Sequence, residues 1–184
     1  MQGIDDQDAL NAVLAKYPDI EVYRHVDAAL FGGYLPYTEY RDAVDRTVHP
    51  FDSIAISGHK FFGMDEPAGL FMTTMEIKEN QNPYSVTYLN GSMPMINCSR
   101  SAIAPLKFWW IIKHVGVEGF TEQATGMLER AAWLKSEFDR LGGELSHIVV
   151  MQHVTEEGLQ EFVDDLAASI EEDASMEEDV KTAA

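Results

Sequence analysis

A short apolar run in the first third of the chain ends abruptly in residues that can carry chemistry. Residues 54–56 read Ile-Ala-Ile, which is typical of a buried strand, and Ser57 and Gly58 end the run. His59 and Lys60 follow at once, and two phenylalanines come next. Burial disfavours the charged form of a lysine, so a lysine in apolar surroundings tends to lose its proton and can then form a Schiff base with a carbonyl. Taken alone, this pattern is more typical of an ordinary surface lysine just past a strand.

His25, Asp27 and Ala29 form a second pattern, upstream of the first. Residues 25–29 read His-Val-Asp-Ala-Ala at the end of a strand predicted over 21–26. Side chains alternate across a strand, so the three residues share one face if the strand continues. The pattern then offers a carboxylate beside a flat space that a ring could occupy. Asp27 alone would be interpreted as a strand-end or helix-capping carboxylate.

The two patterns together are typical of a site for pyridoxal phosphate (PLP). This cofactor needs a lysine for its Schiff base and an acid that keeps its ring nitrogen protonated, which makes the ring an electron sink. In open α/β sheets such sites form beyond the carboxyl ends of strands. Lys60 and Asp27 both follow predicted strands, so the sequence favours a cofactor site built on them.

The charge balance limits the partners of the chain. The 184 residues include 31 acidic and 13 basic residues, a formal net charge of -18, which disfavours a nucleic-acid backbone or an anionic membrane as partner. Cys98 is the single cysteine, so no disulfide can form within the chain and a reducing compartment is expected. No apolar run reaches the ~18 residues of a membrane-spanning helix, and the N-terminus lacks the pattern of a signal peptide. We therefore expect a soluble, cytoplasmic protein.

The hydrophobic periodicity of the first half predicts an α/β layer architecture. We expect, in order, a helix, a strand, a loop and a short helix over residues 4–17, 21–26, 27–36 and 38–44. The strand that begins at Ser53 would pair with a hairpin partner over 69–73.

Helices dominate the second half. We expect a core helix containing Phe108, Trp109 and Trp110, then a long helix, a strand and a final helix, over residues 99–115, 118–141, 147–153 and 155–170. Thr155 is a suitable N-cap for the final helix. Residues 171–179 read EEDASMEED, which is typical of a solvated acidic tail.

The patterns at residues 25–29, 52–54 and 57–60 resemble those of the group II PLP-dependent amino-acid decarboxylases. They read His-Val-Asp-Ala-Ala, Asp-Ser-Ile and Ser-Gly-His-Lys, and they look most similar to the bacterial histidine decarboxylases and the related plant serine decarboxylase-like enzymes. The resemblance runs over about residues 3–141 and 147–165.

The resemblance implies part of a fold-type-I, aspartate-aminotransferase-like α/β structure. Residues 1–115 would form the C-terminal part of the PLP-binding large domain. Residues 116–170 would form a linking helix and a remnant of the small C-terminal domain, and residues 171–184 a disordered acidic tail.

The resemblance also implies roles for five site residues. Lys60 would form the internal aldimine, Asp27 would pair with the pyridinium nitrogen, and Ala29 would lie against one face of the ring. His59 and Ser57 would reach the region of the cofactor phosphate. Lys60, Asp27 and His59 are the expected catalytic residues.

His25 would support this site from the same strand face, although a packed or capping role is equally open for His25 and Ser57. Ser99 and Arg100 resemble a Ser-Arg pair of the histidine decarboxylase branch, and we expect a surface or interface arginine there. No metal site is expected. The other histidines lack metal-ligand spacing and are expected to be structural: His49, His114, His147 and His153.

The implied activity is decarboxylation of an L-amino acid, with histidine favoured, to the amine and carbon dioxide in a homodimer. The substrate amine would displace Lys60, and the ring would stabilise the carbanion through the proton that Asp27 maintains. The alternative is a catalytically incompetent remnant that binds a partner. A cysteine desulfurase-like protein of the same fold group is disfavoured, because the His-Lys and His-x-Asp-Ala-Ala pairing fits decarboxylases better.

Three departures from the family pattern bear on that activity. The family has an N-terminal region that supplies a stacking histidine and much of the phosphate loop, and this sequence begins almost where that region ends. Residues 64–69 read Met-Asp-Glu-Pro-Ala-Gly where relatives usually carry Ser/Cys-Pro-x-Pro-Cys-Gly. Residues 143–146 join two segments that relatives separate. We therefore expect an uncovered sheet edge and exposed rings at residues 61–62 and 109–110.

Overall fold

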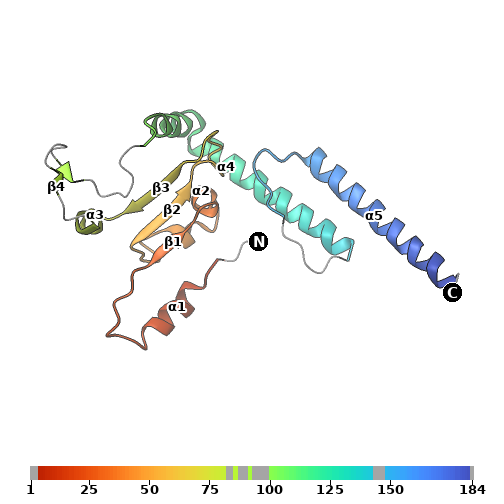
Figure 1. The fold of residues 1–184 in the computed structure, drawn as a ribbon, viewed down its shortest axis with the longest axis horizontal. Coiled ribbons are helices and arrows are strands. Elements are labelled where there is room, and N and C mark those ends of the chain that lie inside the picture. The colour runs from red at the N-terminus through yellow and green to blue at the C-terminus, as the bar shows by residue number, and fades with distance from the viewer. Residues whose placement is uncertain (1–3, 82–84, 87–90, 93–99, 143–147, 183–184) are drawn as a thin grey trace. The chain divides into compact units, whose positions relative to one another are not determined.

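The chain divides into two compact units in a computed structural model (Figure 1). The first unit is Met1–Thr121 and the second is Glu122–Ala184. The structure describes residues 4–81, 85–86, 91–92, 100–142 and 148–182. The predictions for Cys98, Ser99, the join at 143–146 and His147 lie outside these residues.

A three-stranded mixed sheet forms the centre of the first unit. Its strands are β1 (His25–Asp27), β2 (Ser53–Ser57) and β3 (Gly69–Thr73), in that order. β1 and β2 are parallel, whereas β2 and β3 are antiparallel. The predicted hairpin partner over 69–73 is therefore confirmed.

β1 is shorter than the strand predicted over 21–26. The Asp52 carboxylate accepts the Arg24 amide at 2.6 Å, and the Arg24 carbonyl accepts the Asp52 and Ser53 amides at 2.8 and 3.2 Å. A side chain thus replaces one ladder bond at Arg24, and regular pairing begins only at His25.

A short, exposed helix precedes the sheet. α1 (Gln7–Leu14) lies within the predicted helix over 4–17, and the Asp6 side chain caps it by accepting the Ala9 amide at 2.9 Å. None of its residues is buried. Turns over residues 15–17 end the helix before Pro18.

The second half of the loop predicted over 27–36 is helical instead. It contains α2 (Phe31–Tyr34) and the 3-10 helix η1 (Leu35–Tyr37), and η2 (Arg41–Val44) provides the short helix expected over 38–44. Gly32 and Gly33 let the backbone of α2 approach the sheet and the loop after it. A close approach, and not a turn, explains this glycine pair.

Gly32→Ala is expected to lower the free energy of unfolding by about 1–3 kcal/mol, the usual cost of overpacking. A Cβ at Gly32 would lie 2.7 Å from the Ala28 Cβ and 2.8 Å from the Ile56 Cγ1. Gly69→Ala is the matched control, since a Cβ there meets nothing within 4 Å. Urea unfolding of the three proteins measures the difference, and equal midpoints would contradict the close approach.

Phe61 is the centre of an aromatic cluster in the first unit. It is 1% exposed, and its ring centroid lies 5.6–6.2 Å from those of Tyr34, Tyr37, Phe62 and Phe120. Burial raises the pKa of both tyrosines above 10.0. The expectation that residues 61–62 are exposed is therefore wrong, because local aromatic partners bury Phe61.

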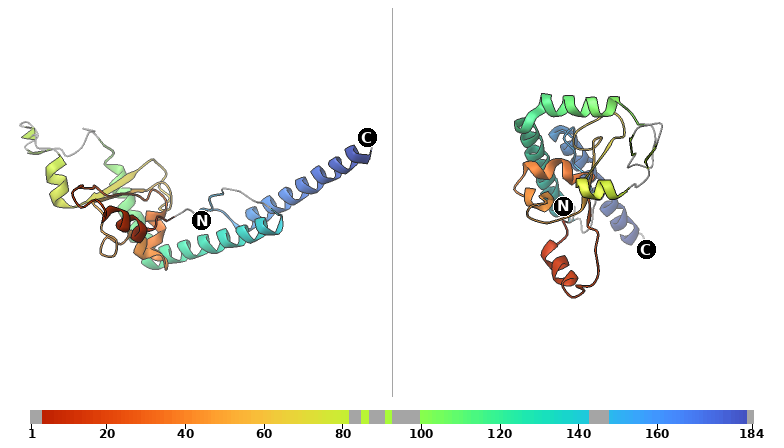
Figure 2. Two further views of the ribbon diagram at one scale, coloured as in Figure 1. Left: turned by 90° about the horizontal axis from the view of Figure 1, so that it is seen from below. Right: turned by 90° about the vertical axis from the view of Figure 1, so that its left-hand side faces the viewer.

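The remaining elements of the first unit are short or helical. α3 is Met75–Gln81, and β4 (Ser85–Val86) and β5 (Gly91–Ser92) form a two-stranded antiparallel sheet. α4 is Ile103–Arg140, and it merges the two helices that were predicted over 99–115 and 118–141. Gly116 separates the two parts with φ 68°, a value that favours glycine, and the helix changes direction there (Figure 2).

The tryptophans of α4 do not lie in a core. Trp109 is 58% exposed and Trp110 is 56% exposed, so the prediction of a core helix is wrong for these side chains. Trp110 stacks on His114 one turn along the same helix, with ring centroids 4.6 Å apart and planes at 10°. The exposure expected for the rings at residues 109–110 is therefore confirmed.

The second unit is helical. Residues 122–140 of α4 and the helix α5 (Glu156–Thr182) share a core of Leu134, Val150, Leu159 and Val163. Thr155 caps α5 as predicted, since its Oγ1 accepts the Gly158 amide at 3.1 Å.

Two features of the second unit differ from the prediction. Residues 148–153 form no strand, because Val150 is buried in a helical core and residues 151–154 turn into α5. The final helix continues over residues 171–182, beyond its predicted end at residue 170. Glutamate, alanine, methionine and lysine in this stretch are good helix formers, so the helix continues through it.

Candidate active site

The two sequence patterns meet at one edge of the sheet. β1 ends at Asp27 and β2 ends at Ser57, and the strands are parallel, so both carboxyl ends lie at the same edge. Asp27 is opposite Ala55 in the register. Beyond the strands, the Ser57 amide donates to the Ala29 carbonyl at 3.0 Å. The segments that follow Asp27 and Ser57 are therefore bonded neighbours, at the place where α/β proteins bind cofactors.

Asp27 presents its carboxylate beside two small residues. The side chain is exposed, and Oδ1 accepts the Ala29 amide at 3.3 Å. Ala28 is fully buried and donates its amide to the Ala55 carbonyl at 3.0 Å, which holds the segment against β2. Ala29 is half-buried and leaves room beside the carboxylate.

Lys60 lies in a tight loop fixed by backbone bonds. The Gly63 amide donates to the Lys60 carbonyl at 3.0 Å, and Gly63 has φ 66°. The Met64 amide donates to the Gly58 carbonyl at 3.0 Å. Lys60 is half-buried, and the buried Phe61 anchors the loop directly after it.

His59 and Ser57 occupy the same loop. His59 is exposed, and its Nδ1 accepts the Ala68 amide at 3.3 Å. The Gly58 amide donates to the Ala68 carbonyl at 2.8 Å, which closes the loop at its base. Ser57 is half-buried.

His25 is fixed by two residues whose roles the sequence did not indicate. Its Nδ1 lies 2.7 Å from Oγ of the buried Ser53, and its ring stacks on Phe71 with centroids 6.0 Å apart and planes at 20°. Ser53 is opposite His25 in the register, so a correct strand pairing would have identified this contact. His25 lies on the same face of β1 as Asp27.

The loop that departs from the family pattern is tied to α4. Lys107 Nζ lies 2.7 Å from Asp65 Oδ1 and 3.4 Å from Glu66 Oε1. The hydrogen bond from Lys107 lowers the pKa of Asp65 below 3.8, and the same bond raises the pKa of Lys107 above 10.5. Met64 is 6% exposed and anchors the start of this loop. An ion pair therefore positions the loop that follows Lys60.

The Lys107–Asp65 ion pair predicts a small loss of stability in acid. Because the folded pKa of Asp65 is lowered, its contribution is present above 3.8 and is lost as the pH falls through the folded value. Urea unfolding of the wild type and Asp65→Asn as a function of pH measures this contribution. The two curves should differ slightly near neutral pH, converge in acid and approach each other in high salt. A difference that persists in acid would contradict the prediction.

The residues present fit PLP. The donor set contains a lysine amine, a carboxylate next to small side chains, and an imidazole and a hydroxyl on the lysine loop. Lys60 and Asp27 would hold the aldehyde carbon and the ring nitrogen. Ala29 would adjoin the ring, and His59 and Ser57 would face the phosphate.

The other expected residues lie apart from this edge. Arg100 and His153 are exposed, His49 is half-buried, and His114 stacks on Trp110. Over the described ranges, no group of three or more His, Cys, Asp and Glu side chains could hold a metal ion. No helix in the described part of the chain is long and apolar enough to cross a membrane.

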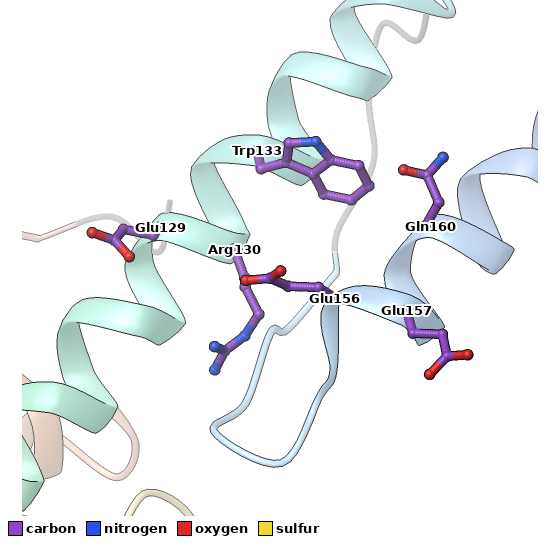
Figure 3. A pocket seen from close by; sticks show the side chains of 6 residues that line it. All are labelled: Glu129, Arg130, Trp133, Glu156, Glu157 and Gln160. Carbon is purple, nitrogen blue, oxygen red and sulfur yellow. The ribbon is translucent and has the colours of Figure 1, made fainter.

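A shallow pocket in the second unit contains none of the expected site residues (Figure 3). It lies between α4 and α5, and Arg130 beside it reaches the Gln152 carbonyl at 3.5 Å. Its lining residues are Glu129, Arg130, Trp133, Glu156, Glu157 and Gln160. None of these residues belongs to the candidate site at the ends of β1 and β2.

Comparison with known proteins identifies relatives of this chain. The pyridoxal-dependent decarboxylase conserved domain matches residues 3–156. Serine decarboxylase 1 of Oryza sativa subsp. japonica is 32% identical over 168 residues, which cover 88% of this chain and 34% of that protein. The histidine decarboxylase of Mesorhizobium japonicum is 30% identical over 141 residues, which cover 77% and 38%.

A solved structure gives the same result. The glutamate decarboxylase of Lactobacillus brevis matches with a TM-score of 0.62 and 29% identity, over 76% of this chain and 33% of that one. The chain thus spans about a third of the length of the relatives that it matches. The expected fold-type-I α/β architecture is confirmed, and PLP is the cofactor of these carboxy-lyases. This chain belongs to the pyridoxal-dependent decarboxylase family.

Proposed function

We propose that this chain carries the part of an amino-acid decarboxylase site that contains Lys60 and Asp27. Lys60 is the residue that binds PLP covalently. The supporting observation is the shared edge of β1 and β2, where the Ser57 amide bonds the Ala29 carbonyl. When bound, PLP withdraws electrons from the α-carbon of the amino acid, so that its carboxylate can leave as carbon dioxide.

The residues of the chain have separate roles in this proposal. Lys60 supplies the amine that binds the aldehyde carbon and that yields to the amine of the substrate. Asp27 accepts a hydrogen bond from the ring nitrogen and keeps it protonated. Ala29 leaves space for the ring, and His59 and Ser57 interact at the phosphate.

The proposed reaction is the decarboxylation of an L-amino acid, and histidine is the proposed substrate. The similarity to the histidine decarboxylase of Mesorhizobium japonicum supports histidine. Serine and glutamate are the competing substrates, since their decarboxylases also match this chain. Carbon dioxide release from each L-amino acid tests the choice, and faster release from serine or glutamate would overturn it.

Cofactor binding tests the proposal directly. The chain is mixed with PLP, reduced with borohydride and digested, and the modified peptide is identified by mass spectrometry. The expected product carries the cofactor on Lys60. Modification spread evenly over exposed lysines, without enrichment at Lys60, would overturn the proposal.

A second candidate function is a catalytically incompetent module that binds a partner. The exposed Trp109 and Trp110 rings on α4 favour this candidate, because large exposed apolar groups mark interaction surfaces. PLP bound at Lys60 without carbon dioxide release from any amino acid would support it. Release of carbon dioxide would exclude it.

We also propose that the protein acts as a homodimer in the cytoplasm. The single cysteine supports a reducing compartment, and the exposed rings of α4 supply apolar surface for a second copy. The acidic balance of the chain disfavours nucleic acid and anionic membranes as partners. Sedimentation of the wild type and of Trp109→Ser/Trp110→Ser should show a dimer and a monomer, and a monomeric wild type would overturn the dimer.

A further inference from the structure

A buried serine, Ser53, and an exposed histidine, His25, form a hydrogen-bonded pair in the first unit. Ser53 is 1% exposed, and its Oγ lies 2.7 Å from His25 Nδ1. The parallel register places the two residues opposite each other, so the pair is set by the sheet itself. Within the described ranges, Ser53 is the one polar side chain in the buried core. A polar group in that position requires a partner to offset its lost hydration.

The direction of this hydrogen bond follows from burial. The hydroxyl hydrogen of a buried serine needs an acceptor. Among the residues that the structure describes, His25 Nδ1 is the acceptor that Ser53 Oγ reaches. On this ground we assign Ser53 as the donor to Nδ1, so that a neutral imidazole carries its single proton on Nε2.

Phe71 fixes the same ring from β3. The His25 and Phe71 rings are 6.0 Å apart and nearly parallel, at 20°. Phe71 is opposite Ala55, and Ala55 is opposite Asp27, so Asp27, Ala55 and Phe71 form one row across the three strands. His25 lies two residues before Asp27 on the same face, at about 6–7 Å along the strand. An imidazole N–H can bridge such a span directly or through one water.

We propose that Ser53 is a positioning residue for the cofactor site. Its hydroxyl holds His25 with Nε2 protonated and its ring against Phe71, so that one N–H donor lies beside the Asp27 carboxylate. This donor orients the Asp27 carboxylate toward the ring nitrogen of PLP. The inference rests on the proposed function, because it assigns Asp27 to that nitrogen.

The test compares Ser53→Ala with Thr73→Val. Thr73 is opposite Ser53 in β3, and its hydroxyl donates to the Asp52 carbonyl at 2.8 Å, so its removal is a matched loss of a hydroxyl that does not contact His25. Nitrogen NMR of the imidazole is measured on the full chain without cofactor. PLP affinity is then measured by titration, followed by mapping of the reduced product.

The wild type and Thr73→Val should show His25 Nδ1 as a hydrogen-bonded acceptor. Ser53→Ala should show the averaged signal of a free imidazole. Its PLP affinity should fall roughly three- to tenfold, the loss typical of one hydrogen bond, with Lys60 still the modified residue. An unchanged Nδ1 signal in Ser53→Ala would overturn the pair, and an unchanged PLP affinity would overturn the positioning role.

Failure of the proposed function gives a different result. A wild type that takes up no PLP at Lys60 contradicts the proposed function and the role of Asp27. The Nδ1 signal of the cofactor-free chain still decides whether Ser53 holds His25. The two failures are therefore distinguishable.

Discussion

Lys60→Ala is expected to abolish the borohydride-reducible link to PLP at the sheet edge. The link requires a primary amine, and the Lys60 loop is fixed by the Gly63 and Met64 amides, so another lysine cannot replace Lys60 without a change in the loop. Reduction, digestion and mass spectrometry of the variant should give no modified peptide over residues 54–64. The long-wavelength absorbance of the wild-type complex should also disappear.

Lys78→Ala is the matched control for this experiment. Lys78 is exposed on α3 and lies away from the carboxyl ends of β1 and β2. Its replacement should leave the modified peptide and the absorbance unchanged. Undiminished labelling in Lys60→Ala would show that PLP reacts with surface lysines and would remove the chemical basis of the proposed function.

Asp27→Asn is expected to keep the cofactor but lower turnover by roughly 10²–10³-fold, the loss typical of one preorganised electrostatic contact. Asparagine preserves the shape of the side chain and removes its charge. The ring nitrogen would then lose the carboxylate that keeps it protonated, and the electron sink would weaken. Carbon dioxide release measures turnover, and the reduced peptide at Lys60 measures retention of the cofactor.

Asp42→Asn provides the control for charge. Asp42 is exposed in η2 and its carboxylate lies 3.8 Å from Arg41, so the replacement removes one negative charge away from the sheet edge. Its turnover should match that of the wild type. A near-normal rate in Asp27→Asn would contradict the role assigned to Asp27.

The strands at the site could be predicted because local signals agree with the fold there. Residues 54–56 and 69–73 are apolar runs bounded by glycine and polar residues, and they form β2 and β3. The Thr155 hydroxyl caps α5 as predicted, and the predicted interruption between residues 115 and 118 falls at Gly116, whose backbone takes φ 68°. The positions of Asp27 and Lys60 at strand ends follow from the same signals.

Other features depend on contacts between segments that are distant in the sequence. Ser53 looks like an ordinary strand residue until the register places it opposite His25. The apolar periodicity around Trp109 is that of a buried helix, although the ring is 58% exposed. Gly32 was placed in a loop, whereas it lies in α2 and permits a close approach to Ala28 and Ile56. Each of these outcomes depends on a partner that periodicity does not specify.

The position of Phe61 links chemical reactivity to cooperative unfolding. Phe61 follows Lys60 directly and is 1% exposed, so the lysine loop cannot open without removing this ring from the aromatic cluster. Opening of the loop therefore carries the free energy of a sub-global event and not of local fraying. The amide protons around Lys60 should exchange with solvent at the same rate as those of the aromatic cluster.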